Sequence, residues 1–332
     1  MKRLVTTLTL MSAVVQSVAL SLAGIGDCSA VVLPSPPVTV VQLGYSVHLL
    51  PLDTASGMDP AGQIIVGTAK GAAVEYINGQ VMPLIGKAGY TKITPTAVSS
   101  NGYIVGFATS GNYIRGLFWA SYTNAPIDMG ALDAATYPQA INSQGVAVGY
   151  TASKAFIWSI SGGIRSIGPP GSVWSQAFDI SESGYVAGLS DFGAGANATR
   201  WYPPNDQYGI AAYNNYANKV MENGTIYGND YSWSLPNNQQ QSITPTPYSL
   251  VYEISTTGRK VGYDYQTLRA WTVPPGGTAE QTLPVPAGIA NSYADEVTGC
   301  GVILGSVTYT NGTTQAVTWT KSTCDGGPPT AL

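Results

Sequence analysis

The segment Ala140–Gly149, AINSQGVAVG, decides the fold because degraded copies of it recur along the chain. Seven copies end on a glycine, and these closing glycines are Gly67, Gly106, Gly149, Gly188, Gly228, Gly262 and Gly305. Successive closing glycines are 34 to 43 residues apart. A repeat of this length is typical of propeller blades or of another array of small structural units.

Each copy predicts a β-hairpin. Short polar residues precede a glycine in the middle of most copies, and this composition suits a tight turn whose glycine takes a positive φ. Apolar runs such as Ile104–Val105 and Val302–Leu304 flank the turn. They are too short for helices and rich in β-branched residues, so they predict short buried strands.

A second recurring feature of the repeat lies 5 to 14 residues after each closing glycine. It is an aromatic residue in a short apolar run: Tyr76, Trp119, Trp158, Trp201, Trp233, Trp271 and Trp319. We expect it on a third strand, where the ring covers the gap that the closing glycine leaves in the sheet. Segments such as Ile127–Gly130 and Ile164–Gly168 then predict a fourth strand. The sequence therefore predicts an all-β fold, a seven-bladed β-propeller of four-stranded antiparallel blades.

The last repeat has no fourth strand of its own, because the chain after Trp319 runs into Cys324 and a Pro/Gly-rich end. Val40–Gly44 has the pattern of the other fourth strands and precedes the first repeat. We predict that it closes the ring by completing the last blade, which would remove exposed strand edges. Residues 31–324 are predicted to form one propeller domain, and residues 325–332 a C-terminal tail.

The alternation of A-x-x-I-N-x-x-G-x-x-x-G with A-F-x-W and a following L-G resembles the HAF-repeat family of bacterial extracellular proteins. The resemblance covers roughly residues 40 to 320. The third and fourth repeats match it well, whereas the first has Tyr76 in place of tryptophan and the last three are loose. The resemblance implies secretion and a repeated β-structure, and it implies no catalytic residues.

Residues 1–30 are predicted to be a signal peptide. Met1–Arg3 is basic, and Leu4–Ala23 is uncharged and apolar. An uncleaved membrane anchor is the alternative, since twenty such residues could span a bilayer. Small residues permit cleavage after Ala23 or after Ala30. We therefore expect a secreted or cell-surface protein without a membrane span once the leader is removed.

Three cysteines in an exported chain predict one disulfide. Cys300 is in the turn of the seventh repeat and Cys324 lies just after its aromatic strand, so we expect these two to pair. If cleavage follows Ala23, Cys28 remains and could compete for Cys324.

Composition excludes several classes of function. Removing Lys2, Arg3 and Asp27 with the leader leaves 12 basic and 17 acidic residues, without a basic cluster, which argues against nucleic acid as a partner. The single histidine, His48, cannot form a histidine metal cluster. Neither a nucleophile elbow nor a P-loop motif occurs.

The expected function depends on the loops. Loops that join second to third strands should share one face of the ring with the connections between blades, and these segments are rich in aromatic residues. Rings on loops suit recognition of a glycan or another extracellular polymer, or of a surface protein. The candidate ligand-binding residues are Tyr113, Trp174, Phe192, Tyr208, Tyr231, Tyr263 and Tyr265. We therefore expect a non-catalytic binding or adhesion propeller.

An alternative uses carboxylates. Asp191, Asp230 and Asp264 follow the closing glycines of three successive repeats by two or three residues. At the mouth of the channel, two of them could catalyse glycoside hydrolysis or a polysaccharide lyase reaction, and three could hold calcium. The simplest interpretation is that these aspartates are solvated loop residues. Apart from calcium, no cofactor is expected.

Overall fold

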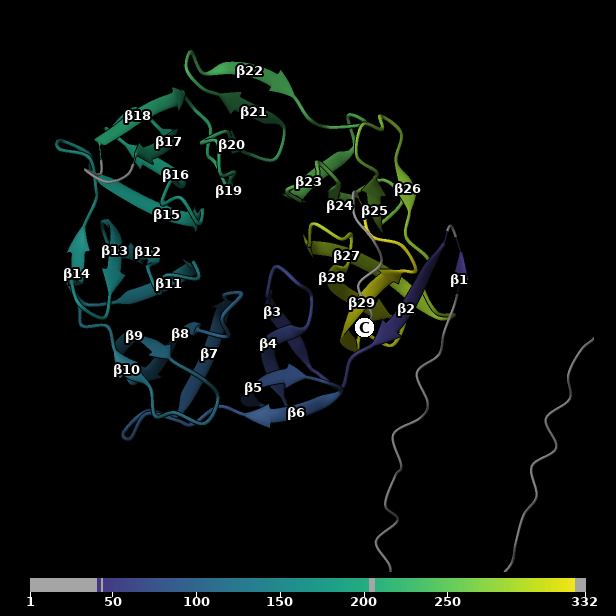
Figure 1. Cartoon of the computed structure of the whole chain (residues 1–332), viewed down its shortest axis with the longest axis horizontal. Helices are drawn as coiled ribbons and strands as arrows, with labels where there is room; N and C mark the ends of the chain where they lie inside the picture. The colour runs from purple at the N-terminus through teal and green to yellow at the C-terminus, as the bar shows by residue number, and fades with distance from the viewer. Residues whose placement is uncertain (1–40, 43, 203–206, 326–332) are drawn as a thin grey trace, which may run out of the picture. The chain divides into compact units, whose positions relative to one another are not determined.

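Seven antiparallel sheets surround a common centre (Figure 1). The computed structural model describes residues 41–42, 44–202 and 207–325, which belong to one compact unit, Pro37–Leu332. Every regular element in this described part is a strand, and no helix there could cross a membrane. The predicted seven-bladed β-propeller is confirmed. The predicted signal peptide lies outside the described residues.

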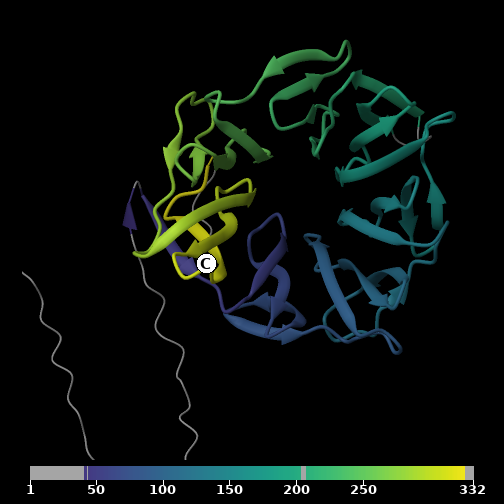
Figure 2. The same cartoon turned by 180° about the vertical axis from the view of Figure 1, so that it is seen from behind.

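Six blades are built from four strands that follow one another from the centre outward, and the seventh blade has five strands (Figures 1 and 2). The inner strands are β3 (Thr54–Met58), β7 (Lys92–Val98), β11 (Thr136–Ile141), β15 (Trp174–Ile180), β19 (Lys219–Val220), β23 (Ser249–Ile254) and β27 (Ile289–Val297). The second strands are β4 (Ile64–Ala69), β8 (Ile104–Ser110), β12 (Ala147–Thr151), β16 (Val186–Asp191), β20 (Ile226–Tyr227), β24 (Lys260–Asp264) and β28 (Ile303–Tyr309). We number the blades 1 to 7 in this order.

The third strands carry the repeated aromatic residue. They are β5 (Ala72–Ile77), β9 (Tyr113–Trp119), β13 (Ala155–Ser159), β17 (Ala196–Tyr202), β21 (Tyr231–Ser234), β25 (Arg269–Val273) and β29 (Thr314–Lys321). The outer strands of blades 1 to 6 are β6 (Gln80–Pro83), β10 (Ile127–Asp128), β14 (Gly163–Ser166), β18 (Gln207–Ala212), β22 (Gln239–Ser242) and β26 (Gln281–Thr282).

An N-terminal strand closes the ring, as predicted, but it is not Val40–Gly44. The strand that pairs with β29 is β2 (Tyr45–Leu49), in a register that runs from Tyr45↔Lys321 to Leu49↔Val317. β1 (Val41–Gln42) pairs with the far side of β2 and adds a fifth strand to blade 7. Gly44 takes a positive φ of 76° in the turn between them, so this segment reverses the chain instead of continuing a strand.

The buried layers between blades explain the repeated tryptophan. Trp119 packs against Val66 and Leu84 of the preceding blade and its connection, and the other third-strand tryptophans occupy equivalent layers. Its indole Nε1 also donates a hydrogen bond to the carbonyl oxygen of Ile85 at 2.8 Å. In blades 2, 4 and 7 the tryptophan therefore fills the layer and also anchors the connection that enters its own blade.

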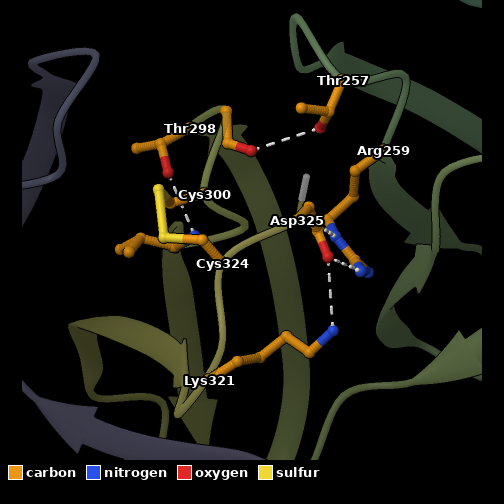
Figure 3. The surroundings of a disulfide bond; sticks show 9 residues. Thr257, Arg259, Thr298, Cys300, Lys321, Cys324 and Asp325 are labelled. Atoms are coloured by element: carbon orange, nitrogen blue, oxygen red, sulfur yellow. Dashed lines mark hydrogen bonds and ion pairs between the residues drawn. A yellow bond between two sulfur atoms is a disulfide. The ribbon is translucent and has the colours of Figure 1, made fainter. Parts of the chain in front are cut away.

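The end of the chain fastens blade 7 to blade 6 (Figure 3). The expected disulfide between Cys300 and Cys324 is formed. The next residue, Asp325, belongs to the propeller and not to a tail, because its carboxylate accepts hydrogen bonds from Nε and Nη2 of Arg259, which is fully buried in blade 6. Lys321 Nζ lies 3.4 Å from the same carboxylate.

Strand order gives the ring two different faces. Because successive strands alternate in direction, the hairpins between second and third strands lie on the same face as the connections between blades. We call this the loop face. The opposite face carries the turns between first and second strands and between third and fourth strands, and we call it the turn face.

Candidate functional site

The loop face collects the exposed apolar side chains. Thirteen large hydrophobic residues are exposed among the described residues, and ten of them lie in loop-face segments: Ile85, Tyr113, Leu132, Val173, Phe192, Tyr213, Tyr216, Tyr248, Tyr265 and Leu268. The other three are on outer strands or on the turn face. The exposed large hydrophobic residues of the described chain therefore gather on one face of the ring.

Some of the predicted ligand-binding residues lie on this surface. Tyr113 at the start of β9, Phe192 after β16 and Tyr265 after β24 are 65%, 40% and 49% exposed. Tyr265 also donates its hydroxyl to the carbonyl oxygen of Pro247 at 2.9 Å, so it fastens two loops together. Trp174, at the start of β15, is half-buried and donates Nε1 to the Asp191 carboxylate at 2.9 Å.

The remaining predicted aromatics lie elsewhere. Tyr208 is not in a loop: it is in the outer strand β18, opposite Trp201 of β17, and therefore lies on the outer wall. Tyr231 begins β21 and packs against the buried cluster between blades 4 and 5. Tyr263 is in β24 and buried, with its ring stacked on Tyr293 at a centroid distance of 4.4 Å. The seven residues do not form one surface.

The three predicted aspartates belong to separate blades. The Asp191 carboxylate accepts hydrogen bonds from the backbone N–H groups of Gly193 and Gly195, which lowers its pKa. The Asp264 carboxylate likewise accepts from Gln266 and Thr267. Asp230 is exposed in the loop of blade 5. Two of these carboxylates therefore have a structural task, holding the loops in which they lie.

The structure does not bring the three aspartates together as a calcium site. In the part of the chain that the structure describes, no group of three or more His, Cys, Asp or Glu side chains could hold a metal ion. The single histidine, His48, lies in β2, and its Nε2 is 3.0 Å from the hydroxyl of Thr320.

The main cavity lies at the centre of the ring. Its volume is about 600 Å³, and residues of all seven inner strands and of the turns after them line it. Pockets of this size hold small organic ligands or a few sugar units. The cavity occupies the turn-side half of the channel, because its lining continues into the turn-face residues.

Seven equivalent residues surround this cavity, one from each inner strand. Each pairs with the residue before a closing glycine, and we call them the channel ring: Gly57, Ala97, Ala140, Asp179, Lys219, Glu253 and Glu296. Blades 1 to 3 contribute only glycine or alanine, and blades 4 to 7 contribute only charged residues. The small residues of blades 1 to 3 therefore leave part of the channel open, and the charged side chains of blades 4 to 7 line the opposite side of it.

The charged half forms a connected network. Lys219 Nζ lies 2.8 Å from Glu253 Oε1 and 3.6 Å from Asp179 Oδ2. The backbone N–H of Val220 donates to Asp179 Oδ2 at 2.8 Å, and that of Met58 donates to Glu296 Oε2 at 2.7 Å. Each of these two carboxylates therefore also bonds to the inner strand of the next blade.

Burial shifts the protonation of this network. Burial, together with the neighbouring charge of Glu253, raises the pKa of Glu296 to about 8. Burial alone would lower the pKa of Lys219, but the charges of Asp179 and Glu253 overcome it and raise that pKa. At neutral pH the network therefore contains an ammonium group and a carboxyl group that keeps its proton.

Two groups of aromatic rings lie on the inner two strands, one in blades 2 to 4 and one in blades 6 and 7, and we call them together the aromatic mouth. Phe107, Tyr137, Tyr150 and Phe178 form a continuous series across blades 2 to 4, with successive centroid distances of 5.3, 5.2 and 6.4 Å. In blades 6 and 7, Tyr252 lies close to the stacked pair of Tyr263 and Tyr293. Among these rings, Phe178 lines the cavity.

Sequence reasoning missed the channel ring, although a signal for it exists. In six of the seven repeats, the channel residue is nine positions before the closing glycine, as Ala140 is before Gly149. Asp179, Lys219, Glu253 and Glu296 therefore depart from an alanine in the repeat. The sequence alone does not predict that these four residues line the channel, because no motif distinguishes the positions of the repeat that face the centre of the ring.

Comparisons with solved structures show the same fold. A streptogramin B lyase structure matches with a TM-score of 0.59 at 10% identity, over 83% of this chain and 98% of that one. YCF48 bound to D1 peptide matches with a TM-score of 0.52 at 12% identity, over 86% and 100%. A puromycin hydrolase structure matches with a TM-score of 0.50 at 9% identity, over 90% and 55%.

At such low identity these likenesses establish the propeller and nothing about activity. Two of the three proteins are named as enzymes and the third binds a peptide, so the shared fold does not choose between catalysis and binding. No protein-family model matches the chain, and no curated protein matches it in sequence.

Proposed function

We propose that this protein is an exported, non-catalytic binding or adhesion propeller whose loop face recognises a glycan or a similar extracellular polymer. Export is inferred from the basic and apolar start of the chain and from the resemblance to HAF-repeat proteins. The single observation that carries the proposal is the concentration of exposed apolar side chains on one face of the ring.

Within the loop face, exposed rings follow one arc across blades 4 to 6. Phe192 is 40%, Tyr213 79%, Tyr216 38%, Tyr248 43% and Tyr265 49% exposed. Flat rings stack on the apolar faces of sugar rings, and tyrosine hydroxyl groups can exchange hydrogen bonds with sugar hydroxyls. An arc of such rings suits a chain of sugar units better than a single small ligand.

The test is binding to a glycan array, followed by titration of the glycan that binds best. Tyr213→Ala removes the most exposed ring of the arc and should weaken binding about tenfold or more, because a buried ring contributes about 1.5–3 kcal/mol. Tyr208→Ala is the matched control, since Tyr208 is 39% exposed but lies on the outer wall. Equal effects of the two substitutions, or no glycan binding at all, would refute the proposal.

A catalytic function is the second candidate, and the paired carboxylates of the cavity favour it. Glu253 and Glu296 lie in adjacent blades, and burial raises the pKa of both carboxyl groups, that of Glu296 to about 8, which suits Glu296 to the role of a general acid. Release of new reducing ends from the bound polysaccharide, lost in Glu296→Gln, would establish catalysis. Binding without release would support the non-catalytic function.

A further inference from the structure

The channel combines aromatic rings with carboxylates of two kinds. Among the acids that line the cavity, Asp59, Glu182 and Glu222 fasten the turns: their carboxylates accept backbone N–H groups of Gln63, Ser143 and Ser183. Glu253 and Glu296 face the centre instead. Lys219 is the one cationic side chain in the lining, so the cavity is net negative.

Asp295 adds a carboxylate next to the aromatic mouth. It is the extra residue of the β-bulge in β27, between Ala294 and Glu296. Its equivalents in blades 2 to 4, Thr96, Gln139 and Phe178, all line the cavity.

Tyr252, the equivalent bulge residue of blade 6, is close enough to Asp295 for that charge to help raise its pKa. Within the described chain, the side chain of Asp295 is exposed, no group donates a hydrogen bond to its carboxylate, and desolvation by the surrounding protein raises its pKa to about 6. A ligand in the channel can therefore reach it.

Rings and carboxylates in one channel favour a positively charged ligand with an apolar body. A cation within about 6 Å of a ring centroid is attracted by the ring quadrupole, more strongly where water is excluded. Low-dielectric walls of one sign also concentrate counter-ions at the centre. Gly57, Ala97 and Ala140 leave the opposite side of the ring free for the body of the ligand.

We propose that the channel, at the aromatic mouth and Asp295, binds a free amino group of the glycan, so that the preferred ligand is an amino polysaccharide. This proposal rests on the proposed recognition of a glycan and specifies its chemistry. The rings of Tyr252 and Phe178 contact the sugar, and Asp295 accepts hydrogen bonds from its ammonium group. The loop-face arc holds the neighbouring sugar units.

The test compares two oligomers with the same backbone. At about pH 7 most Asp295 carboxyl groups are ionised and a hexamer of glucosamine still carries charged amines, whereas a hexamer of N-acetylglucosamine is neutral. Titration calorimetry of the intact protein should show the glucosamine hexamer binding about tenfold more tightly, which is the effect of about 1.4 kcal/mol. This preference should shrink as salt is added, because screening weakens attraction between exposed charges.

Two variants locate the effect. Asp295→Asn keeps the size of the side chain and should bring the ratio of the two affinities close to one, without changing the affinity for the neutral hexamer. Asp53→Asn is the matched control: Asp53 is an exposed loop-face acid that accepts one hydrogen bond, from the N–H of Gly71. It should leave the ratio unchanged. Unaltered thermal unfolding of both variants shows that they are folded.

The outcomes separate this inference from the proposed function. Equal affinity of the normal protein for both hexamers, or a preference that survives Asp295→Asn, overturns the amine site. If other, neutral glycans still bind through Tyr213, the proposed function stands. If no glycan of either kind binds, both proposals fail.

Discussion

Each closing glycine makes room for a carbonyl group of the inner strand. A Cβ atom at Gly149 would overlap the carbonyl oxygen of Tyr137, and the other six closing glycines meet the same group of their own blades. The cause is a β-bulge in the inner strand, between Pro138 and Ala140 in blade 3. In blades 5 to 7 the third-strand tryptophan ring is also among the nearest groups, so the aromatic residue packs directly over the closing glycine there.

At the same scale, we predict that Glu296 makes stability depend on pH. Its folded pKa of about 8 lies above the unfolded value of 4.5, so between these pH values the folded protein keeps a proton that the unfolded chain has lost. The free energy of unfolding therefore falls as pH rises through this range, by at most about 1.4 kcal/mol per pH unit. Glu296→Gln stays neutral and should remove that slope.

Urea unfolding at a series of pH values between about 4.5 and 8 measures this slope. Asp53→Asn serves as the control, because Asp53 is exposed and remote from the channel. A slope in Glu296→Gln as steep as in the normal protein would show that Glu296 does not carry the effect.

At the scale of elements, the repeat predicts the strands well because its period is strong. Turn glycines and third-strand aromatics recur at restricted intervals, and every third strand contains its expected aromatic residue. The closing strand was misplaced because Val40–Gly44 and Tyr45–Leu49 are both short and largely apolar. Tyr45–Leu49 is the segment that pairs with β29, because this pairing buries Tyr45 and Val47 in the cluster around Trp319.

This assignment predicts different results for two truncations. Removing residues 1–40 should leave a monomer with unchanged thermal unfolding, because β2 still pairs with β29. Removing residues 1–49 exposes the edge of β29 and the buried cluster beside it, so it should lower the midpoint strongly and cause association. Size-exclusion chromatography and thermal unfolding measure both effects. A stable monomer without residues 1–49 would contradict closure by β2.

At the scale of the whole molecule, the sequence predicted that one face carries the functional loops, and the exposed side chains are distributed accordingly. It could not predict which individual rings are exposed. Tyr263 and Tyr265 are two residues apart, yet the first is stacked in a buried pair and the second is half exposed in a loop. The difference depends on where β24 ends and on Tyr293 of the next blade, which is distant in sequence.

The end of the chain is held beside the junction of blades 6 and 7 by a disulfide within blade 7 and by an ion pair between Asp325 and Arg259 of blade 6. The disulfide joins residues 24 positions apart, and a loop of this length contributes about 3 kcal/mol by restricting the unfolded chain. It also places Asp325 against the buried Arg259, whose charge lowers the pKa of Asp325 although burial opposes the shift. The ion pair therefore stabilises the protein above the unfolded pKa of 3.8 and is lost as pH falls through the lower folded value.

Replacing both Cys300 and Cys324 by serine should therefore lower the free energy of unfolding by about 3 kcal/mol at neutral pH. Asp325→Asn, with the disulfide intact, should also destabilise the protein, because it leaves the buried Arg259 without its counter-charge. Its effect should vanish as the pH falls below the folded pKa of Asp325, whereas that of the serine variant should persist. Urea unfolding at neutral and acidic pH separates the two links, and equal pH dependence of both variants would show that the disulfide acts only by positioning Asp325.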